Sequence, residues 1–129
     1  MNIVVNLDEI SYENIFFNDS IKNTVIDNST FSKLLYSNRD IVLNGIYIKV
    51  DINKNNNNNI ITNLNILEKQ ILTNFNNHKL HNYKIKDQIN HLITKLHISN
   101  KNTFSYMLKI SGIWETNTII GLTYKFIFL

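Results

Sequence analysis

Hydrophobic and polar residues alternate with a period of two along five stretches of the chain, a pattern typical of β-strands with one buried face. The predicted strands cover residues 1–7, 31–36, 41–50, 105–115 and 119–129. The polar residues 37–40 (SNRD) predict a turn between the second and third strands. Residues 8–30 mix aromatic and polar positions without a clear period, and we assign them no element.

The pair Asn44-Gly45 inside the third stretch allows two interpretations. An Asn-Gly pair between apolar runs is a strong signal for a two-residue hairpin, which would set Asp40 opposite Lys49. The alternative is one long strand with a bulge at Gly45, where the missing Cβ lets the chain bend. We favour the bulged strand because residues 37–40 already offer a turn.

The period changes to 3.6 residues after an Asn-rich tract at residues 53–59, for which we expect an exposed, mobile loop. Two apolar stripes follow, and they predict a helical pair over residues 60–98, joined by a basic connector at residues 78–84. The stripes are Ile60, Leu64, Leu67, Ile71 and Phe75, and then Ile85, Ile89, Leu92, Ile93 and Leu96. Each helix has one apolar face, so both should pack on a core formed by the strands.

The last two predicted strands are joined by residues 116–118, and their apolar faces coincide only if this loop has an odd number of residues. The predicted cross-strand pairs are Trp114–Ile120, Gly112–Leu122, Ile110–Tyr124, Leu108–Phe126 and Tyr106–Phe128. This register puts Trp114 in the core, where aromatic residues usually pack. The opposite face then carries Ser111 beside Thr123, and Lys109 beside Lys125. Two facing ammonium groups repel one another unless water or an anion separates them.

The order of elements predicts a single α+β domain over residues 1–129. Three strands, a helical insertion and a C-terminal hairpin follow the order of an OB-fold, a small antiparallel β-barrel. A strongly curved or open antiparallel sheet with the helical pair packed on it fits the same order almost as well.

Composition narrows the class of protein. The 129 residues include 24 Asn, 22 Ile and 12 Lys but one Arg, a bias that an A+T-rich genome imposes on any protein. The lack of Cys excludes disulfide scaffolds, thiolate metal sites and cysteine nucleophiles. No apolar run is long enough for a membrane span and the first residues lack a signal-peptide pattern, so we expect an intracellular protein without a membrane partner.

Charge divides the chain into two unequal parts. Residues 1–51 contain four Lys and Arg against seven Asp and Glu, a net of −3, whereas residues 52–129 contain nine Lys against three acids, a net of +6. A basic part indicates an anionic partner such as nucleic acid, although Lys is also the default polar residue of such a genome.

Local signatures of catalysis are missing from the sequence. His78, His81, His91 and His97 form no HExxH site, and no carboxylate cluster completes a set of metal ligands. The three glycines form no phosphate-binding loop, and no nucleophile elbow occurs. We therefore expect neither an enzyme nor a bound metal or cofactor.

Four segments carry a resemblance to a known group of proteins: residues 35–38 (LYSN), 43–48 (LNGIYI), 108–116 (LKISGIWET) and 121–126 (GLTYKF). They resemble a family of small uncharacterised proteins of giant DNA viruses, and more distantly the OB-fold single-stranded DNA-binding proteins of viruses. The resemblance implies an OB-like fold and a role in viral DNA replication, in the host cytoplasm or in the virion. Many replication proteins of this kind end in an acidic tail, a pattern from which residues 126–129 (FIFL) depart.

These observations together predict a non-catalytic nucleic-acid-binding protein that favours single-stranded DNA. Its phosphate contacts would be Lys109, Lys125, Lys49 and Arg39, and its stacking surface for a base would be Tyr47 or Tyr36. The alternative is a structural or interaction protein of a virion that binds no nucleic acid. Self-association into a homo-oligomer is compatible with either function.

Overall fold

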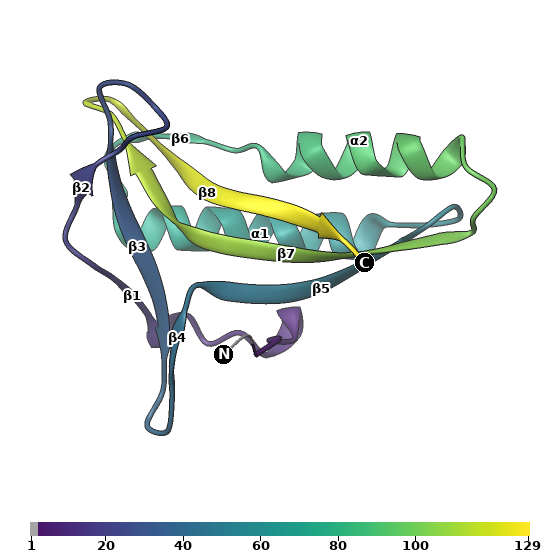
Figure 1. Cartoon of the computed structure of the whole chain (residues 1–129), viewed down its shortest axis with the longest axis horizontal. Helices are drawn as coiled ribbons and strands as arrows, with labels where there is room; N and C mark the ends of the chain where they lie inside the picture. Colours follow the sequence, from purple (N-terminus) through teal and green to yellow (C-terminus); the bar gives the residue numbers. More distant parts are fainter. Residues whose placement is uncertain (1–2) are drawn as a thin grey trace.

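The computed structural model describes residues 3–129, which form a curled eight-stranded sheet with two helices packed against it (Figure 1). The strands are β1 (Ile15–Phe17), β2 (Ile21–Lys22), β3 (Thr30–Ser37), β4 (Val42–Asn44), β5 (Ile46–Asn53), β6 (Leu80–Asn82), β7 (Thr103–Glu115) and β8 (Ile119–Phe128). The helices are α1 (Asn58–Phe75) and α2 (Ile85–His97). The predicted α+β class, with a helical pair inserted before a C-terminal hairpin, is confirmed.

Strand β7 is the centre of the sheet because it has partners along both edges. One edge pairs antiparallel with β8, while the other pairs first with β5 and then, from Gly112 onward, with β3. The second half of β3 leaves β7 and pairs instead with β1 and β4. This change of partners curls the sheet into a half-barrel, and within residues 3–129 it does not close into a complete one.

Gly45 bends one long strand into two. β4 and β5 follow one another with only Gly45 between them, yet β4 pairs with β3 and β5 pairs with β7. Gly45 has a φ of +89°, and a Cβ added to it would lie 2.6 Å from the carbonyl oxygen of Ile110, so only glycine fits without strain. The bulged-strand interpretation is therefore confirmed. The hairpin at Asn44-Gly45, with its Asp40–Lys49 pair, is wrong.

Both helices bury the apolar stripes that the sequence predicts. The fully or nearly fully buried residues are Leu64, Leu67, Ile71 and Leu72 of α1, and Ile85, Ile89, Leu92 and Leu96 of α2. They share one core with the inward-facing side chains of β5, β7 and β8. Burial of this apolar surface holds the helices on the sheet. In the part of the chain that the structure describes, neither helix combines the length and the apolar composition needed to cross a membrane.

The loop in the Asn-rich tract is shorter than predicted, because β5 extends to Asn53 and α1 begins at Asn58. Asn side chains hold the backbone between them. The Asn57 side chain accepts a hydrogen bond from the Asn53 N–H at 2.9 Å and donates one to the Asn53 carbonyl oxygen at 2.7 Å. The Asn53 side chain accepts from the N–H groups of Asn55 and Asn56, both at 2.9 Å. Side-chain amides thus satisfy the last backbone groups at the edge of β5.

The basic connector contains a strand that the sequence pattern does not reveal. β6 runs parallel to the beginning of β8, which makes the sheet mixed rather than purely antiparallel. Lys79 anchors this segment by donating hydrogen bonds to Glu115 Oε2 at 2.7 Å and to the Thr116 carbonyl oxygen at 2.8 Å. Three residues are too few for a periodic signal, so β6 depends on its contact with β8.

The strand predicted for residues 1–7 is wrong where the structure can test it, since residues 1 and 2 lie outside the described chain. Val4 forms only an isolated parallel bridge with Tyr47 of β5, and a 3-10 turn begins at Leu7. The alternating apolar residues here pack against the core as an extended segment rather than as a paired strand.

The terminal hairpin has the predicted three-residue loop, but a β-bulge at Ser111 shifts its register. The pairs Tyr106–Phe128, Leu108–Phe126 and Ile110–Tyr124 form as predicted. Beyond the bulge the pairs are Gly112–Thr123, Ile113–Leu122, Trp114–Gly121 and Glu115–Ile120, so the predicted pairs Gly112–Leu122 and Trp114–Ile120 and the Ser111–Thr123 neighbours are wrong. One extra residue exchanges the two faces of a strand. Ile113 is consequently buried, and Trp114 lies on the face that points away from the helices.

Candidate nucleic-acid interface

The helices leave one face of the sheet uncovered, and we term it the open face. In Figure 1, α1 lies behind the sheet and the open face is turned toward the viewer. Its side chains alternate along the strands with the buried ones, as a pleated sheet requires. They are Phe31 and Lys33 on β3, Tyr47 and Lys49 on β5, Met107, Lys109 and Trp114 on β7, and Thr123, Lys125 and Ile127 on β8.

A cross-strand row on the open face joins three residues that the sequence singled out. Tyr47 of β5 pairs with Lys109 of β7, and Lys109 pairs with Lys125 of β8. The Lys109 ammonium lies 5.6 Å from the centre of the Tyr47 ring, within the range of a cation–π contact. Lys49 stands in the next row, opposite Met107. Four of the six predicted binding residues are therefore brought together.

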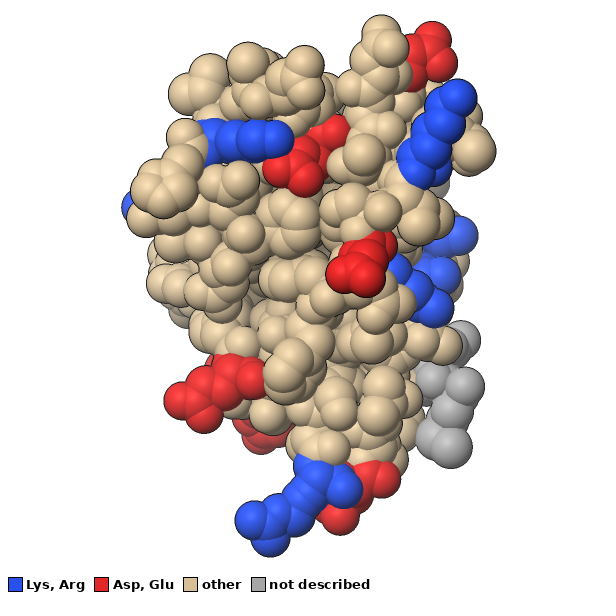
Figure 2. Space-filling model, turned by 90° about the vertical axis from the view of Figure 1, so that its left-hand side faces the viewer, with Lys and Arg blue, Asp and Glu red and all other residues tan. Residues whose placement is uncertain are grey.

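Within residues 3–129, no carboxylate forms an ion pair with a lysine of this row. Across residues 3–129 the ion pair that forms is Lys79–Glu115, at the opposite end of β7. Asp51 belongs to the same face two residues beyond Lys49, and its carboxylate accepts a hydrogen bond from the Ser105 hydroxyl. The adjoining side of the molecule, where β1, β2 and β3 lie in Figure 1, shows basic and acidic groups next to one another at several places (Figure 2). Among the described residues, Lys109 and Lys125 are therefore direct cross-strand partners that form no ion pair with a carboxylate.

Two further aromatic rings, which are not among the predicted site residues, belong to the open face. The Trp114 indole covers Gly121, since a Cβ added to that glycine would lie 2.4 Å from indole Cζ2. The Phe31 ring covers Gly112, where an added Cβ would lie 2.8 Å from two ring carbons. Both rings remain partly accessible. The signal that could have found Trp114 is the Ser111-Gly112 pair, because a glycine inside a strand often marks a bulge.

Two predicted site residues do not belong to the open face. Tyr36 is buried at 9% exposure on the inner face, and its hydroxyl accepts a hydrogen bond from the Ser11 N–H at 3.0 Å. It is a core residue and offers no stacking surface. Arg39 is exposed in the turn between β3 and β4, a hairpin that extends away from the rest of the sheet (Figure 1). Lys33, which the sequence analysis did not select, lies on the open face instead.

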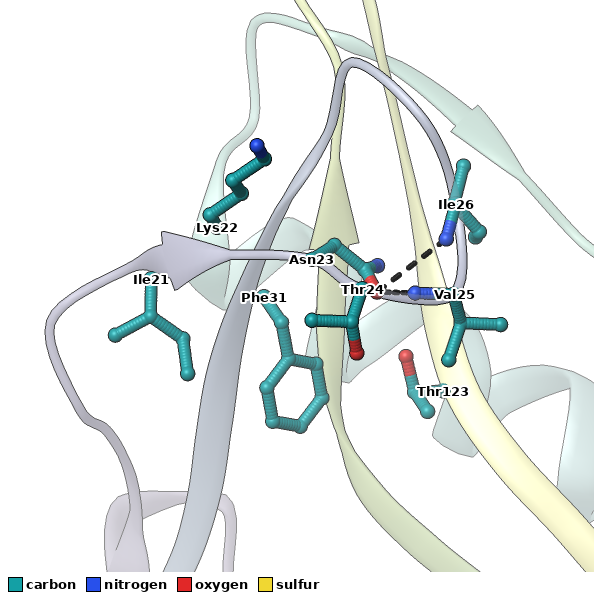
Figure 3. Close-up of a pocket in the computed structure, with 8 residues that line it drawn as sticks. All are labelled: Ile21, Lys22, Asn23, Thr24, Val25, Ile26, Phe31 and Thr123. Atoms are coloured by element: carbon teal, nitrogen blue, oxygen red, sulfur yellow. Dashed lines mark hydrogen bonds between the residues drawn. The ribbon is translucent and has the colours of Figure 1, made fainter.

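A pocket of about 320 Å³ opens at the end of the open face, where the loop after β2 arches over the sheet (Figure 3). Its lining is mostly apolar and consists of Ile21, Lys22, Asn23, Thr24, Val25, Ile26, Phe31 and Thr123. The Asn23 side chain holds the loop by accepting hydrogen bonds from the N–H groups of Val25 at 2.9 Å and Ile26 at 3.4 Å. Thr123 connects the pocket to the lysine row, because Lys125 follows two residues later on the same face of β8.

Buried ionisable groups lie on the other side of the sheet. Glu68 of α1 is 1% exposed and accepts hydrogen bonds from the N–H groups of Lys84 and Ile85 at 3.0 and 3.3 Å, so it caps the start of α2. Burial raises the pKa of Glu68, against the opposing effect of these two bonds, and Asp87 raises it further. Burial, with Glu68 and Asp87 nearby, raises the pKa of Tyr124 to about 12. These groups serve the packing of α2.

Metal ligands do not converge in the described part of the chain, where no three His, Asp or Glu side chains are placed to share an ion. His81 illustrates this: one ring nitrogen lies 2.9 Å from the Tyr83 hydroxyl and the other 2.9 Å from the Asn76 carbonyl oxygen. The histidine is thereby occupied by the local structure around β6.

No protein-family model, curated protein or solved structure matches the chain.

Proposed function

We propose that the protein is a non-catalytic nucleic-acid-binding protein whose site is the open face. The observation that carries the proposal is the row of Tyr47, Lys109 and Lys125, in which two lysines are direct cross-strand partners and neither forms an ion pair within residues 3–129. Like charges on directly paired residues of neighbouring strands destabilise a sheet. An anion bound between them would remove that cost, and the phosphate backbone of a nucleic acid supplies a regular series of such anions.

The aromatic residues on the same face favour a single strand over a duplex. Tyr47 and Trp114 are partly accessible and lie on the same side of the sheet as Lys49, Lys109 and Lys125. Single-stranded DNA exposes the flat faces of its bases, which stack on aromatic side chains, whereas a duplex keeps them covered. Sheet faces of OB-folds bind oligonucleotides in this manner. We accordingly propose that the curled sheet binds single-stranded DNA on its open face, as OB-folds do. The resemblance to giant-virus proteins adds the proposal of a role in viral DNA replication.

The test is a titration of the protein with fluorescent oligo-dT of about 16 nucleotides, the upper end of the usual site size for one small domain. Binding should weaken steeply as salt is raised, because bound phosphates release counterions. Engagement of Lys33, Lys49, Lys109 and Lys125 on a single strand gives an expected slope of log K against log salt of about −3. Lys109→Glu with Lys125→Glu should lower the affinity more than tenfold and leave the melting temperature nearly unchanged.

The matched control is Lys69→Glu with Lys101→Glu, which changes the net charge by the same amount. Lys69 is exposed on α1 and Lys101 in the turn before β7, both away from the open face. This variant should lose only the small, uniform share of affinity that net charge contributes. Equal losses in the two double variants, or no binding of oligo-dT at low salt, would rule out the open face as a nucleic-acid site.

A second candidate, an interaction protein without nucleic acid, is favoured by the exposed end of β8. Ile127, Phe128 and Leu129 are 39, 63 and 58% exposed, and beyond Gly121 no described strand pairs with the outer edge of β8. An unpaired, apolar edge is a surface on which another chain can add a strand. Sedimentation measurements that show self-association, lost on Phe128→Lys, together with no binding of oligo-dT, would support this candidate.

A further inference from the structure

The pocket beneath the loop after β2 is lined by large apolar side chains that remain exposed. Val25 is 88% exposed and Ile21 is 63% exposed, although both line it with apolar side chains. The Phe31 ring forms part of its wall and is fixed by its seat on Gly112. A volume of about 320 Å³ is at the small end of the range for ligand pockets. The pocket can therefore hold one small, mostly apolar group.

Two hydroxyl groups in the pocket can form hydrogen bonds with the edge of a bound ligand. The hydroxyl groups of Thr24 and Thr123 point into the space between the loop and the sheet (Figure 3). Neither hydroxyl forms a hydrogen bond with another group of residues 3–129, so each is available as a donor and an acceptor. A nucleobase combines a flat face with donors and acceptors along its edge, and pockets that take an unstacked base read it through both.

Positive charge near the pocket indicates that its occupant belongs to an anionic chain. Lys33 stands on the open face in the cross-strand row that runs through Gly112 to Thr123, whereas Lys22, which also lines the pocket, turns its ammonium group away from it (Figure 3). Lys125 lies two residues from Thr123 on the same face of β8, roughly 7 Å along the strand. An apolar pocket flanked by lysines on one surface fits a base that is linked to phosphates.

We propose that this pocket receives one unstacked base of a single-stranded nucleic acid whose phosphates run along Lys125 and Lys109. The inference rests on the proposed function and adds a base-binding site to its phosphate-binding row. The loop of residues 23–26 closes over the base, Phe31 contacts its face, and the hydroxyls of Thr24 and Thr123 contact its edge.

Amide chemical shifts in the unmodified protein give the decisive test. Oligo-dT should shift the amide signals of Asn23, Thr24, Val25 and Thr123 as well as those of Lys109 and Lys125. An oligonucleotide of the same length that consists of abasic deoxyribose phosphates should shift only the signals at the two lysines. Pocket signals that stay in place while the lysine signals move with both probes would overturn the inference and leave the proposed function standing. No shift with either probe would remove both.

A pair of variants adds an affinity measurement. Phe31→Leu removes the aromatic wall and should weaken oligo-dT binding about tenfold, a typical loss for one stacked base, with little effect on the abasic probe. Phe104→Leu is the control, since Phe104 pairs with the buried Ile52 and therefore belongs to the inner face. Affinity for oligo-dT that Phe31→Leu leaves unaltered, in a variant that melts as a folded protein, would contradict the base-binding site. Dimers in sedimentation that disappear on Val25→Asp, without pocket shifts by oligo-dT, would show that the pocket is a protein contact instead.

Discussion

The indole of Trp114 lies on the backbone of Gly121, its direct partner across the terminal hairpin. Phe31, the partner of Trp114 on the other edge of β7, covers Gly112 in the same way. Two glycines in neighbouring strands thus make room for two rings on the open face. The rings are held by the sheet itself, so their positions are set before any ligand arrives.

Gly121→Ala tests the seat of the indole. The added methyl group would lie 2.4 Å from indole Cζ2, so the ring must move or the strands must separate. We expect the free energy of unfolding to fall by about 1–3 kcal/mol, the usual cost of overpacking. Urea denaturation followed by the fluorescence of Trp114, the single tryptophan of the chain, measures this directly. An unstrained Gly→Ala change typically stabilises a protein. A gain in stability would therefore show that the indole does not occupy this seat.

The sequence predicts those parts of the fold that local periodicity controls. The apolar stripes of α1 and α2 were predicted correctly, because the buried residues of an amphipathic helix recur every three or four positions. The predicted loop length and the pairs from Tyr106–Phe128 to Ile110–Tyr124 were correct. The pairs between Ser111 and the loop were wrong, because Ser111 bulges out of the ladder and shifts the register by one residue. Alternation continues on both sides of a bulge, so the pattern alone does not reveal it. β6 was missed because three residues form a strand only beside β8.

The part of the candidate site that was predicted correctly comes from residues paired within a single hairpin. Lys109 and Lys125 follow from the hairpin register, and the β5–β7 pairing, which the sequence does not specify, adds Tyr47 and Lys49 to their face. The prediction of Tyr36 was wrong because its side chain lies on the inner face of β3, where its hydroxyl accepts a hydrogen bond from the Ser11 N–H. The prediction of Arg39 was wrong because the chain bends at Gly45, so the turn between β3 and β4 lies away from the open face. Such long-range placements depend on partners far away in the sequence.

Glu68 should make the stability of the protein depend on pH. Its pKa in the folded state is raised above its usual value near 4.5, so the folded state binds the proton more tightly than the unfolded state. The resulting stabilisation is complete below the unfolded pKa and disappears as pH rises through the raised folded pKa. We expect the melting temperature of the native protein, relative to Glu68→Gln, to decline over this interval. Thermal unfolding of both proteins from pH 4 to pH 8 measures the difference.

Glu68→Leu separates the cap from the charge. Leucine removes both acceptors and leaves the N–H groups of Lys84 and Ile85 without partners, which should cost about 1–3 kcal/mol. Glutamine keeps one acceptor oxygen without the buried charge, so Glu68→Gln should cost less at pH 7. If leucine and glutamine prove equally stable, Glu68 does not act as the cap of α2.

Tyr124 should limit stability at alkaline pH. Its pKa of about 12 in the folded state exceeds the ordinary value of 10, so the folded state keeps the phenol proton where the unfolded state has lost it. The stabilisation is complete below pH 10 and is lost between pH 10 and 12. Tyr124→Phe preserves the ring and removes the proton, so it should flatten this part of the stability curve. The absorbance of tyrosinate at alkaline pH identifies the tyrosine that titrates last. If Tyr124→Phe leaves the pH dependence of stability unchanged, the loss of stability above pH 10 belongs to Tyr12 or Tyr106, whose pKa values burial also raises.

Lys125→Glu should stabilise the protein and weaken its binding to oligo-dT at the same time. In the native chain Lys125 faces Lys109 directly across the hairpin, so a glutamate there exchanges repulsion for attraction. We expect a gain of about 0.5 kcal/mol in urea unfolding at low salt, and no gain at about 1 M salt, where screening acts within a few ångströms. Lys101→Glu is the control, because it makes the same change of charge in a turn without a cross-strand partner. A gain in both variants would reflect net charge alone, and a loss specific to Lys125→Glu would show that the two ammonium groups do not repel. If Lys125→Glu makes the protein more stable but weakens its binding to oligo-dT, the native lysine pair lowers the free energy of unfolding of the unbound protein. Binding of an anionic ligand would then offset that loss of stability.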